Sequence, residues 1–294
     1  MISPSLDINK GFIDVDDKFS AVGSAFRKVV VENVDLARAA LVIARIEYPD
    51  LDPERFILRL DALAAAVRER MPPNAKTEQQ VATLNLYLFT EQQYHGNDAD
   101  YYDPGNSCLN AVLQCKTGIP ITLSLLYMEI ARRLGLTVHG IAFPGHFLVR
   151  VECERGLIVL DPFNKGQTLN EIEVRHRLAQ ARGQGYAEMA DLGEVLAAAS
   201  DKELLLRMLR NLKKIYTQRG KTAKAITAIS LTLIADPNAG IEWRDRGLLY
   251  RELEAFRAAL SDLSHYLETT PDAEDGEVVR HLVMELHGIN ARFN

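Results

Sequence analysis

The chain has 294 residues, of which 47% are hydrophobic and 25% charged, an ordinary soluble composition with enough length for two domains. The net charge of −6 argues against a broad surface for nucleic acid or anionic lipid, so neither partner is expected. The three cysteines have no regular spacing, which predicts reduced thiols in a cytoplasmic protein rather than a disulfide framework.

The first 20 residues have neither the layout of a signal peptide nor a lipidation motif, and we expect an extended acidic segment there. No uncharged apolar run reaches the roughly 18 residues that a membrane-spanning helix needs. The nearest candidate follows Pro120, and the charged residues Glu129, Arg132 and Arg133 interrupt it. We therefore expect no membrane segment.

Three helices are predicted before the centre of the chain, because each begins at a capping residue and ends at a turn or proline signal. They run from the cap Asp35 to before Pro49, from Asp52-Pro53 to Arg70, and from Thr77 to about Tyr94, where Gln80 would complete a capping box with Thr77. The segment 95–107 is then rich in turn-forming residues. Loops often carry binding residues, so Tyr102 and Asn106 are candidates for the wall of a groove, although a plain connecting loop explains them equally well.

The most distinctive stretch runs from Thr117 to Asp161. Pro120 fits the first turn of a helix, and the apolar residues after it predict a buried helix over 120–134 that Gly135 ends. Three β-prone runs follow, at 137–143, 146–153 and 157–161, with a hairpin turn at 154–156. This order predicts a central helix leading into a small antiparallel sheet.

The hairpin places His146 and Asp161 near the same end of neighbouring strands. An imidazole that a carboxylate orients is two-thirds of a nucleophilic triad. A turn histidine after Pro144-Gly145 and an Asp-Pro strand terminator account for the same spacing, so both interpretations stay open. If the domain has a groove, these two residues are its polar groups, with Pro144, Gly145 and Phe147 shaping its wall.

The order of these elements resembles the transglutaminase-like fold of papain-type cysteine enzymes. The matching residues are Gly118 to Pro120, His146-Phe147-Leu148 and Asp161-Pro162. More narrowly, the segments TGIPITLSLLYMEIARRLGL, PGHFLVRV and LDPFNKG resemble the bacterial SirB family, which joins such a domain to tetratricopeptide-like repeats. The resemblance implies that fold and a regulatory role in bacteria.

One departure from the enzyme pattern affects the chemistry, because Pro120 stands where the pattern has cysteine. The helix dipole and an imidazolium lower the pKa of a thiol at that position, and proline offers no group to replace it. Cys115, five residues earlier, is the first alternative. We therefore expect a degenerate, non-catalytic domain; the alternative is a cysteine-dependent peptidase or acyltransferase that uses Cys115 or Cys108 with His146 and Asp161.

The seven histidines form no HExxH or HxH pattern, and no glycine-rich phosphate-binding motif occurs. Neither a metal nor a cofactor is expected. Asn170 is a plausible cap for a basic helix that contains Arg175, His176, Arg177 and Arg182, and a solvated face is the simplest interpretation of these charges. We place a transglutaminase-like domain at 1–195 and repeats at 196–294.

The tail contains an internal repeat of 34 residues, the tetratricopeptide period. This offset aligns Tyr216 with Tyr250 and Pro237 with Pro271, whereas Gly220 meets Glu254. Such repeats stack into a concave surface, which predicts a protein or peptide partner. The whole chain is therefore predicted to be α+β, with a helix-rich transglutaminase-like domain followed by an all-α segment. Trp243 and Tyr250 of the second unit are expected to pack between helices.

Overall fold

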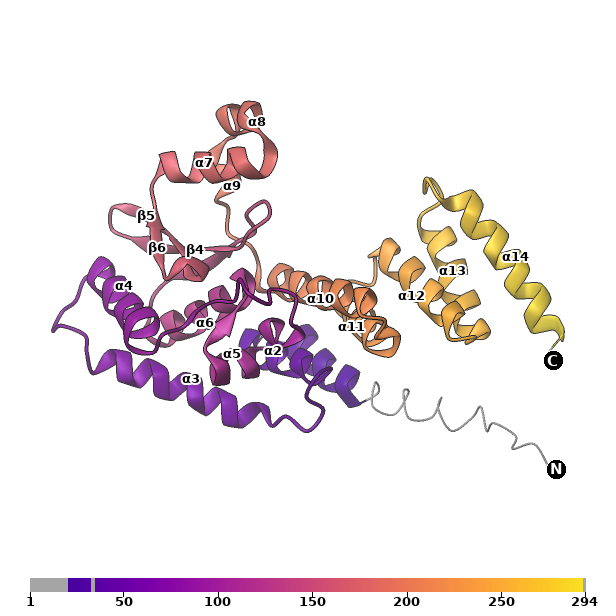
Figure 1. Cartoon of the computed structure of the whole chain (residues 1–294), viewed down its shortest axis with the longest axis horizontal. Coiled ribbons are helices and arrows are strands. Elements are labelled where there is room, and N and C mark those ends of the chain that lie inside the picture. Colours follow the sequence, from indigo (N-terminus) through magenta and orange to yellow (C-terminus); the bar gives the residue numbers. More distant parts are fainter. Residues whose placement is uncertain (1–20, 33–34, 293–294) are drawn as a thin grey trace. The chain divides into compact units, whose positions relative to one another are not determined.

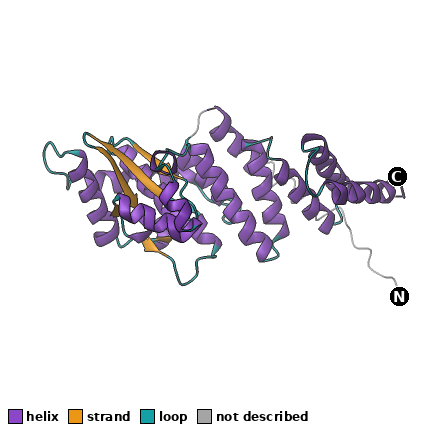
Figure 2. Ribbon diagram, turned by 90° about the horizontal axis from the view of Figure 1, so that it is seen from above, coloured by secondary structure: helices purple, strands orange, loops and turns teal. Residues whose placement is uncertain are grey.

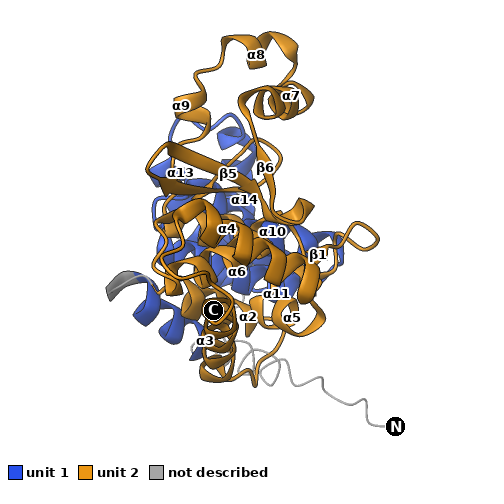
Figure 3. Ribbon diagram, turned by 90° about the vertical axis from the view of Figure 1, so that its left-hand side faces the viewer, with its two compact units in different colours: residues 1–33, 209–294 blue, residues 34–208 orange. Residues whose placement is uncertain are grey.

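The computed structural model describes residues 21–32 and 35–292 (Figure 1). It divides the chain into two compact units, Val34–Met208 and a second unit made of Met1–Asn33 and Leu209–Asn294 (Figure 3). The division falls inside helix α10 (Asp201–Gln218), after the eighth residue of that helix. The expected acidic segment over the first 20 residues lies outside the described part of the chain.

The three predicted N-terminal helices are present as α2 (Leu36–Ala44), α3 (Pro53–Arg68) and α4 (Thr77–Asn85). The predicted caps Asp35 and Asp52 accept hydrogen bonds from the main-chain N–H groups of Arg38 and Glu54, at 3.0 and 3.1 Å. The third cap was predicted one residue too late, because the N–H of Lys76 bonds to Oε1 of Gln79 at 3.0 Å. Helix α4 then continues as the π-helix η2 (Leu86–Glu91).

Short elements lead from η2 to the central helix. They are β1 (His95–Gly96), the 3-10 helix η3 (Pro104–Ser107), α5 (Leu109–Cys115) and β2 (Thr117–Gly118). Strands β1 and β2 pair in parallel, which fixes the chain immediately before α6 (Pro120–Arg133). Every residue of α6 from Pro120 to Ala131 is buried, as expected for a helix that is apolar over most of its circumference.

The strands, orange in Figure 2, include a four-stranded antiparallel sheet with the order β3-β4-β5-β6. Its strands are β3 (Val138–Ile141), β4 (Leu148–Cys153), β5 (Gly156–Asp161) and β6 (Gln167–Leu169). Cys153 pairs with Gly156, so the predicted hairpin turn between β4 and β5 is confirmed. Strand β4 begins two residues later than predicted, because Pro144 lacks an N–H group and Gly145 has a φ of +70°, and pairing with β3 therefore stops at Leu148.

Helices cover both faces of the sheet in Figure 1. On one face, Leu148, Val159 and Leu169 share a core with Val174 and Leu178 of helix α7 (Glu171–Arg182). Residues of α8 (Gln184–Met189) and α9 (Leu192–Val195) complete this core. Helix α6 contacts β3 and β4 and lies on the other side of the sheet from α7 in Figure 1.

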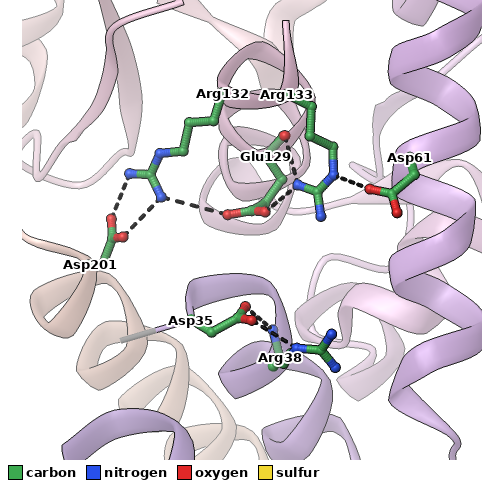
Figure 4. A network of polar contacts seen from close by, with 7 residues as sticks. All are labelled: Asp35, Arg38, Asp61, Glu129, Arg132, Arg133 and Asp201. Atoms are coloured by element: carbon green, nitrogen blue, oxygen red, sulfur yellow. Dashed lines mark hydrogen bonds and ion pairs between the residues drawn. The ribbon is translucent and has the colours of Figure 1, made fainter. Parts of the chain in front are cut away.

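A polar network lies at the C-terminal end of α6 (Figure 4). Arg132 makes two hydrogen bonds to the Asp201 carboxylate, at 2.7 and 2.9 Å, and thereby ties the first turn of α10 to α6. Arg133 binds Asp61 of α3 at 2.7 Å and Glu129 at 2.6 Å. Burial raises the pKa of Glu129, and the neighbouring guanidinium groups of Arg133 and Arg132 only partly oppose this effect.

The second unit consists largely of antiparallel helices. They are the end of α10, α11 (Thr222–Ala235), α12 (Gly240–Glu252), α13 (Phe256–Thr269) and α14 (Gly276–Arg292). The described N-terminal residues 21–32 belong to the same unit and are also helical, ending in the π-helix η1 (Lys28–Glu32). Helices α11 and α13 begin and end 34 residues apart, which confirms the predicted period. Trp243 donates from Nε1 to the main-chain oxygen of Pro237 at 2.9 Å and contacts His265 edge-on, so it packs within the repeats as expected. None of the helices in the described ranges is long and apolar enough to cross a membrane.

Candidate functional site

His146 lies in the turn between β3 and β4. Its main-chain N–H donates to the main-chain oxygen of Phe143 at 3.1 Å, and Pro144 and the exposed Gly145 form the bend between these two residues. The sequence placed His146 on a strand, but it precedes β4 by two residues. The side chain is 20% exposed, so part of it faces solvent.

Asp161 is the last residue of β5 and is completely buried. Its Oδ1 accepts hydrogen bonds from the main-chain N–H groups of Phe163 and Asn164, at 3.1 and 3.2 Å, and so caps the 3-10 helix η4 (Pro162–Asn164). Its Oδ2 accepts from Asn164 Nδ2 at 2.7 Å and from Arg177. The carboxylate is therefore held by several donors in addition to His146.

The structure brings His146 and Asp161 together, with Nε2 of the imidazole 3.0 Å from Oδ1 of the carboxylate. Burial acts to raise the pKa of Asp161, but the hydrogen bonds and charges of His146, Asn164 and Arg177 outweigh it and lower the pKa to about 2. An ionised carboxylate only accepts hydrogen bonds, so Nε2 must carry the proton. In the neutral ring, Nδ1 is then an acceptor, and no described residue bonds to it.

Aromatic rings extend from His146 towards the surface. The Phe163 ring meets the imidazole edge-on at 5.9 Å between centroids, and Tyr101 meets Phe163 at 6.4 Å. Tyr102 packs edge-on against Tyr101 at 5.4 Å. Tyr101 and Tyr102 are 39% and 53% exposed, and we call the set of Tyr101, Tyr102, Phe163 and His146 the aromatic patch. Gly96 allows the approach of Phe163, since a Cβ there would lie 2.5 Å from its ring.

Two residues expected in the groove lie below the surface. Asn106 is buried and donates from Nδ2 to the main-chain oxygen of Asp100 at 2.6 Å, while its own main-chain oxygen accepts from the Thr122 hydroxyl at 2.6 Å. It thereby fastens the loop that carries Tyr101 and Tyr102 to the start of α6. Phe147 is 1% exposed and packs over Gly140.

The start of α6 holds no cysteine. Pro120 is its first residue and is buried. Cys115 is exposed at the end of α5, and the β1–β2 pairing fixes the chain between it and α6. Cys108 is buried and donates to the main-chain oxygen of Pro104 at 3.3 Å. Cys153 lies at the turn of the β4–β5 hairpin, at the opposite end from Asp161.

Sequence reasoning missed Arg177, whose guanidinium binds the buried Asp161. The basic residues of α7 were interpreted as a solvated face, and only the tertiary fold brings this one to β5. Arg177 and Asn164 also line a cavity of about 540 Å³ together with residues of β6 and α7. The 16-residue separation from Asp161 carries no local signal that could have revealed the pair.

The repeats have a charged hollow of their own. A cavity of about 380 Å³ is lined by Arg210, Lys213, Lys214, Thr217 and Gln218 of α10 and by Glu242 of α12. Lys213 Nζ pairs with Glu242 at 2.7 Å and with Asp245 at 2.5 Å. Over residues 21–32 and 35–292, no three His, Cys, Asp or Glu side chains converge as metal ligands.

Comparisons with known proteins agree with this architecture. The family model of the transglutaminase-like superfamily matches residues 54–210, and that of the tetratricopeptide repeat matches residues 212–284. Repeats of this kind generally mediate contacts between proteins. No solved structure matches the chain.

Several curated bacterial proteins are similar over most of their length. A UPF0162 protein of Xylella fastidiosa is 38% identical over 253 residues, which cover 86% of this chain and 90% of that protein. The UPF0162 protein PA3419 of Pseudomonas aeruginosa is 30% identical over 81% of this chain and 85% of its own. Protein SirB1 of Salmonella typhimurium is 27% identical over 78% and 84%, respectively. The chain, in which a transglutaminase-like domain is followed by tetratricopeptide repeats, therefore belongs to the transglutaminase-like superfamily and, within it, to the proteins named UPF0162 and SirB1.

Proposed function

We propose that this is a non-catalytic, cytoplasmic interaction protein in which the aromatic patch and the repeats bind a protein or peptide partner. The observation that carries the proposal is the incomplete catalytic set around His146. Asp161 orients the imidazole and leaves Nδ1 without a partner among the described residues, but Pro120 supplies no nucleophile at the start of α6. The oriented histidine is then available as a hydrogen-bonding group for a ligand.

The exposed tyrosines support a binding role. Tyrosine combines a large apolar surface with a polar hydroxyl group and is enriched in protein interfaces. Tyr101 and Tyr102 are exposed side by side on a loop that Asn106 holds in place. A preorganised loop loses little conformational entropy on binding, which favours affinity.

Photo-crosslinking tests the binding role directly. The full-length protein would carry a photoreactive phenylalanine analogue at Tyr102 or, as a matched control, at Tyr186 of α8, since these side chains are 53% and 52% exposed. We expect a discrete cross-linked partner from position 102 and none from position 186. The identified partner, once purified, must then bind the wild-type protein saturably. Equal cross-linking from both positions, or failure of the purified partner to bind, contradicts the proposal.

The oriented His146–Asp161 pair also favours a second candidate, a cysteine-dependent peptidase or acyltransferase. Such an enzyme needs a thiolate near the imidazole, and Cys115 is the exposed cysteine closest in sequence to α6. Alkylation rates measured against pH, with peptide mapping of each thiol, separate the two candidates. A thiol with a pKa well below the roughly 8.5 of a free cysteine, and dependent on His146, would support the enzyme. Three ordinary or slow thiols support the non-catalytic protein.

A further inference from the structure

The guanidinium group of Arg207 lies directly beside the aromatic patch. Arg207 belongs to α10 and donates from Nη2 to the main-chain oxygen of His146 at 2.8 Å, and from Nη1 to that of Phe143 at 3.4 Å. Its guanidinium carbon also lies 5.5 Å from the centroid of the Phe147 ring. Arg207 therefore holds both ends of the turn that presents His146.

This cation has no counter-ion in the described part of the chain. Arg177 neutralises Asp161, and the hydrogen bonds of Arg207 go to main-chain oxygens only. The neighbouring Tyr101 is uncharged at neutral pH, because a tyrosine has a pKa near 10 and burial raises that of Tyr101 further. Half-buried charges are normally paired, so the surroundings of His146 carry one uncompensated positive charge.

The donors of Arg207 are not exhausted. A guanidinium group has five N–H groups in a planar fork, and the two bonds to carbonyl oxygens leave three without a protein acceptor among the described residues. This fork matches the two oxygens of a carboxylate. Resting on the proposed function of the aromatic patch, we propose that Arg207, which lies beside His146, forms a subsite for a carboxylate group of the bound peptide.

The chemistry favours a carboxylate over a phosphate. A single guanidinium balances one negative charge, whereas phosphate carries more charge and is usually bound by several cations or by the N–H groups of a helix N-terminus. The neighbouring rings of Tyr101, Tyr102 and Phe163 offer apolar contact area for a peptide. The carboxylate has two sources in a peptide, the C-terminus and an acidic side chain.

The test follows the imidazole signals of His146 by NMR in the full-length protein, with the signal identified by its loss in His146→Gln. Four probes are titrated: Ac-Gly-Gly-Phe with a free C-terminal carboxylate, the same peptide as its amide, Ac-Gly-Asp-Phe amide, and inorganic phosphate. We expect saturable shifts with a carboxylate peptide and at least about tenfold weaker binding of Ac-Gly-Gly-Phe amide. Whichever acidic peptide binds more tightly identifies the source of the carboxylate.

Variants of α10 assign the effect to Arg207. Arg207→Gln should weaken the carboxylate peptide about tenfold or more, and Arg207→Lys, which keeps the charge but loses the planar fork, should weaken it less. Arg182→Gln, at the exposed C-terminal end of α7, is the matched control and should bind like the wild type. If Arg207→Gln does not fold, weakened binding by Arg207→Lys decides the question.

Three results would overturn the subsite: binding of Ac-Gly-Gly-Phe amide as tight as that of the tighter acidic peptide, tighter binding of phosphate than of either acidic peptide, or no saturable shift with any probe. Unchanged binding by every folded Arg207 variant would overturn it as well. The function proposed for the patch fails separately, because Tyr102 cross-linking does not depend on which part of the partner carries a carboxylate. A specific cross-link that survives in Arg207→Lys and Arg207→Gln would retain the interaction protein and remove the carboxylate subsite.

Discussion

Gly220 and Glu254 occupy the same position in successive repeats, and both have left-handed backbone conformations, with φ of +63° and +58°. The second repeat has Glu254 in place of the consensus glycine, but its backbone keeps the conformation that the turn requires. A residue with a Cβ pays about 1 kcal/mol for this conformation, whereas glycine does not.

Glu254→Gly is therefore expected to raise the free energy of unfolding by up to about 1 kcal/mol, and Gly220→Ala to lower it by a similar amount. Urea denaturation of the full-length variants measures both changes. Glu254→Ala controls for loss of the carboxylate, because it keeps the Cβ in the left-handed region. If Glu254→Gly and Glu254→Ala are equally stable, backbone strain at this turn is not the cause.

Two helix glycines are expected to respond to alanine in opposite directions. A Cβ on Gly247 of α12 would lie 2.8 Å from Leu263 of α13, so Gly247→Ala should destabilise the repeats by about 1–3 kcal/mol. A Cβ on Gly288 of α14 would meet no atom within 4 Å, and Gly288→Ala should stabilise by up to about 1 kcal/mol through helix propensity. Thermal unfolding compares the two variants, and a shared sign would contradict the packing of α12 on α13.

Asp161→Asn should cost about 3 kcal/mol or more at neutral pH, because it leaves Arg177 without its counter-ion in a buried site. The folded-state pKa of about 2 lies below the ordinary value of 3.8, so the unfolded chain binds the proton more tightly. The pH-dependent part of the stabilisation, about 2 kcal/mol, is then fully present above pH 4 and is lost as the pH falls through 2.

The measurement for Asp161 is the difference in unfolding free energy between wild type and Asp161→Asn from pH 6 down to the lowest pH at which both fold. Taking this difference removes the contributions of the other titrating groups. We expect the difference to shrink below about pH 4. A constant difference across that range would show that the carboxylate is not stabilised in its ionised form.

The Arg132–Asp201 pair is expected to stabilise the first turn of α10. Its geometry is bidentate and the side chains are 31% and 26% exposed, so a double-mutant cycle with Arg132→Gln and Asp201→Asn should give a coupling of about 1 kcal/mol. The control cycle uses Arg175 and Glu171, a more exposed pair on α7 for which about 0.3 kcal/mol is expected. Equal couplings would indicate that the pair is only a surface contact.

Local sequence patterns were sufficient for much of this fold. The buried helix after Pro120, the hairpin around 154–156 and the 34-residue period all depend on neighbouring residues or a fixed spacing, and each is confirmed. Errors occurred at the edges of elements, as at Thr77, where one residue decides which side chain caps the helix.

The candidate site was only partly predictable for a different reason. His146 and Asp161 lie on one hairpin, so the spacing between them indicates their contact. Arg177 and Arg207 reach the same place from α7 and α10, and their contacts depend on how whole helices pack. Phe163 follows Asp161 in sequence, but its contact with Tyr101 requires the loop before α5 to fold over β5 and η4.

Helix α10 runs from Asp201 to Gln218 without a glycine or proline. Its first two turns supply Asp201 and Arg207 to the unit that contains His146, and its later turns supply Lys213 to the hollow of the repeats. A gene fragment that stops at residue 195 would encode the His146 turn without the arginine that holds it. In a fragment that starts at residue 209, the first helix of the repeats would lack the N-terminal part of α10. The two halves thus share an inseparable piece of chain, and recombination or truncation at this junction is expected to damage both.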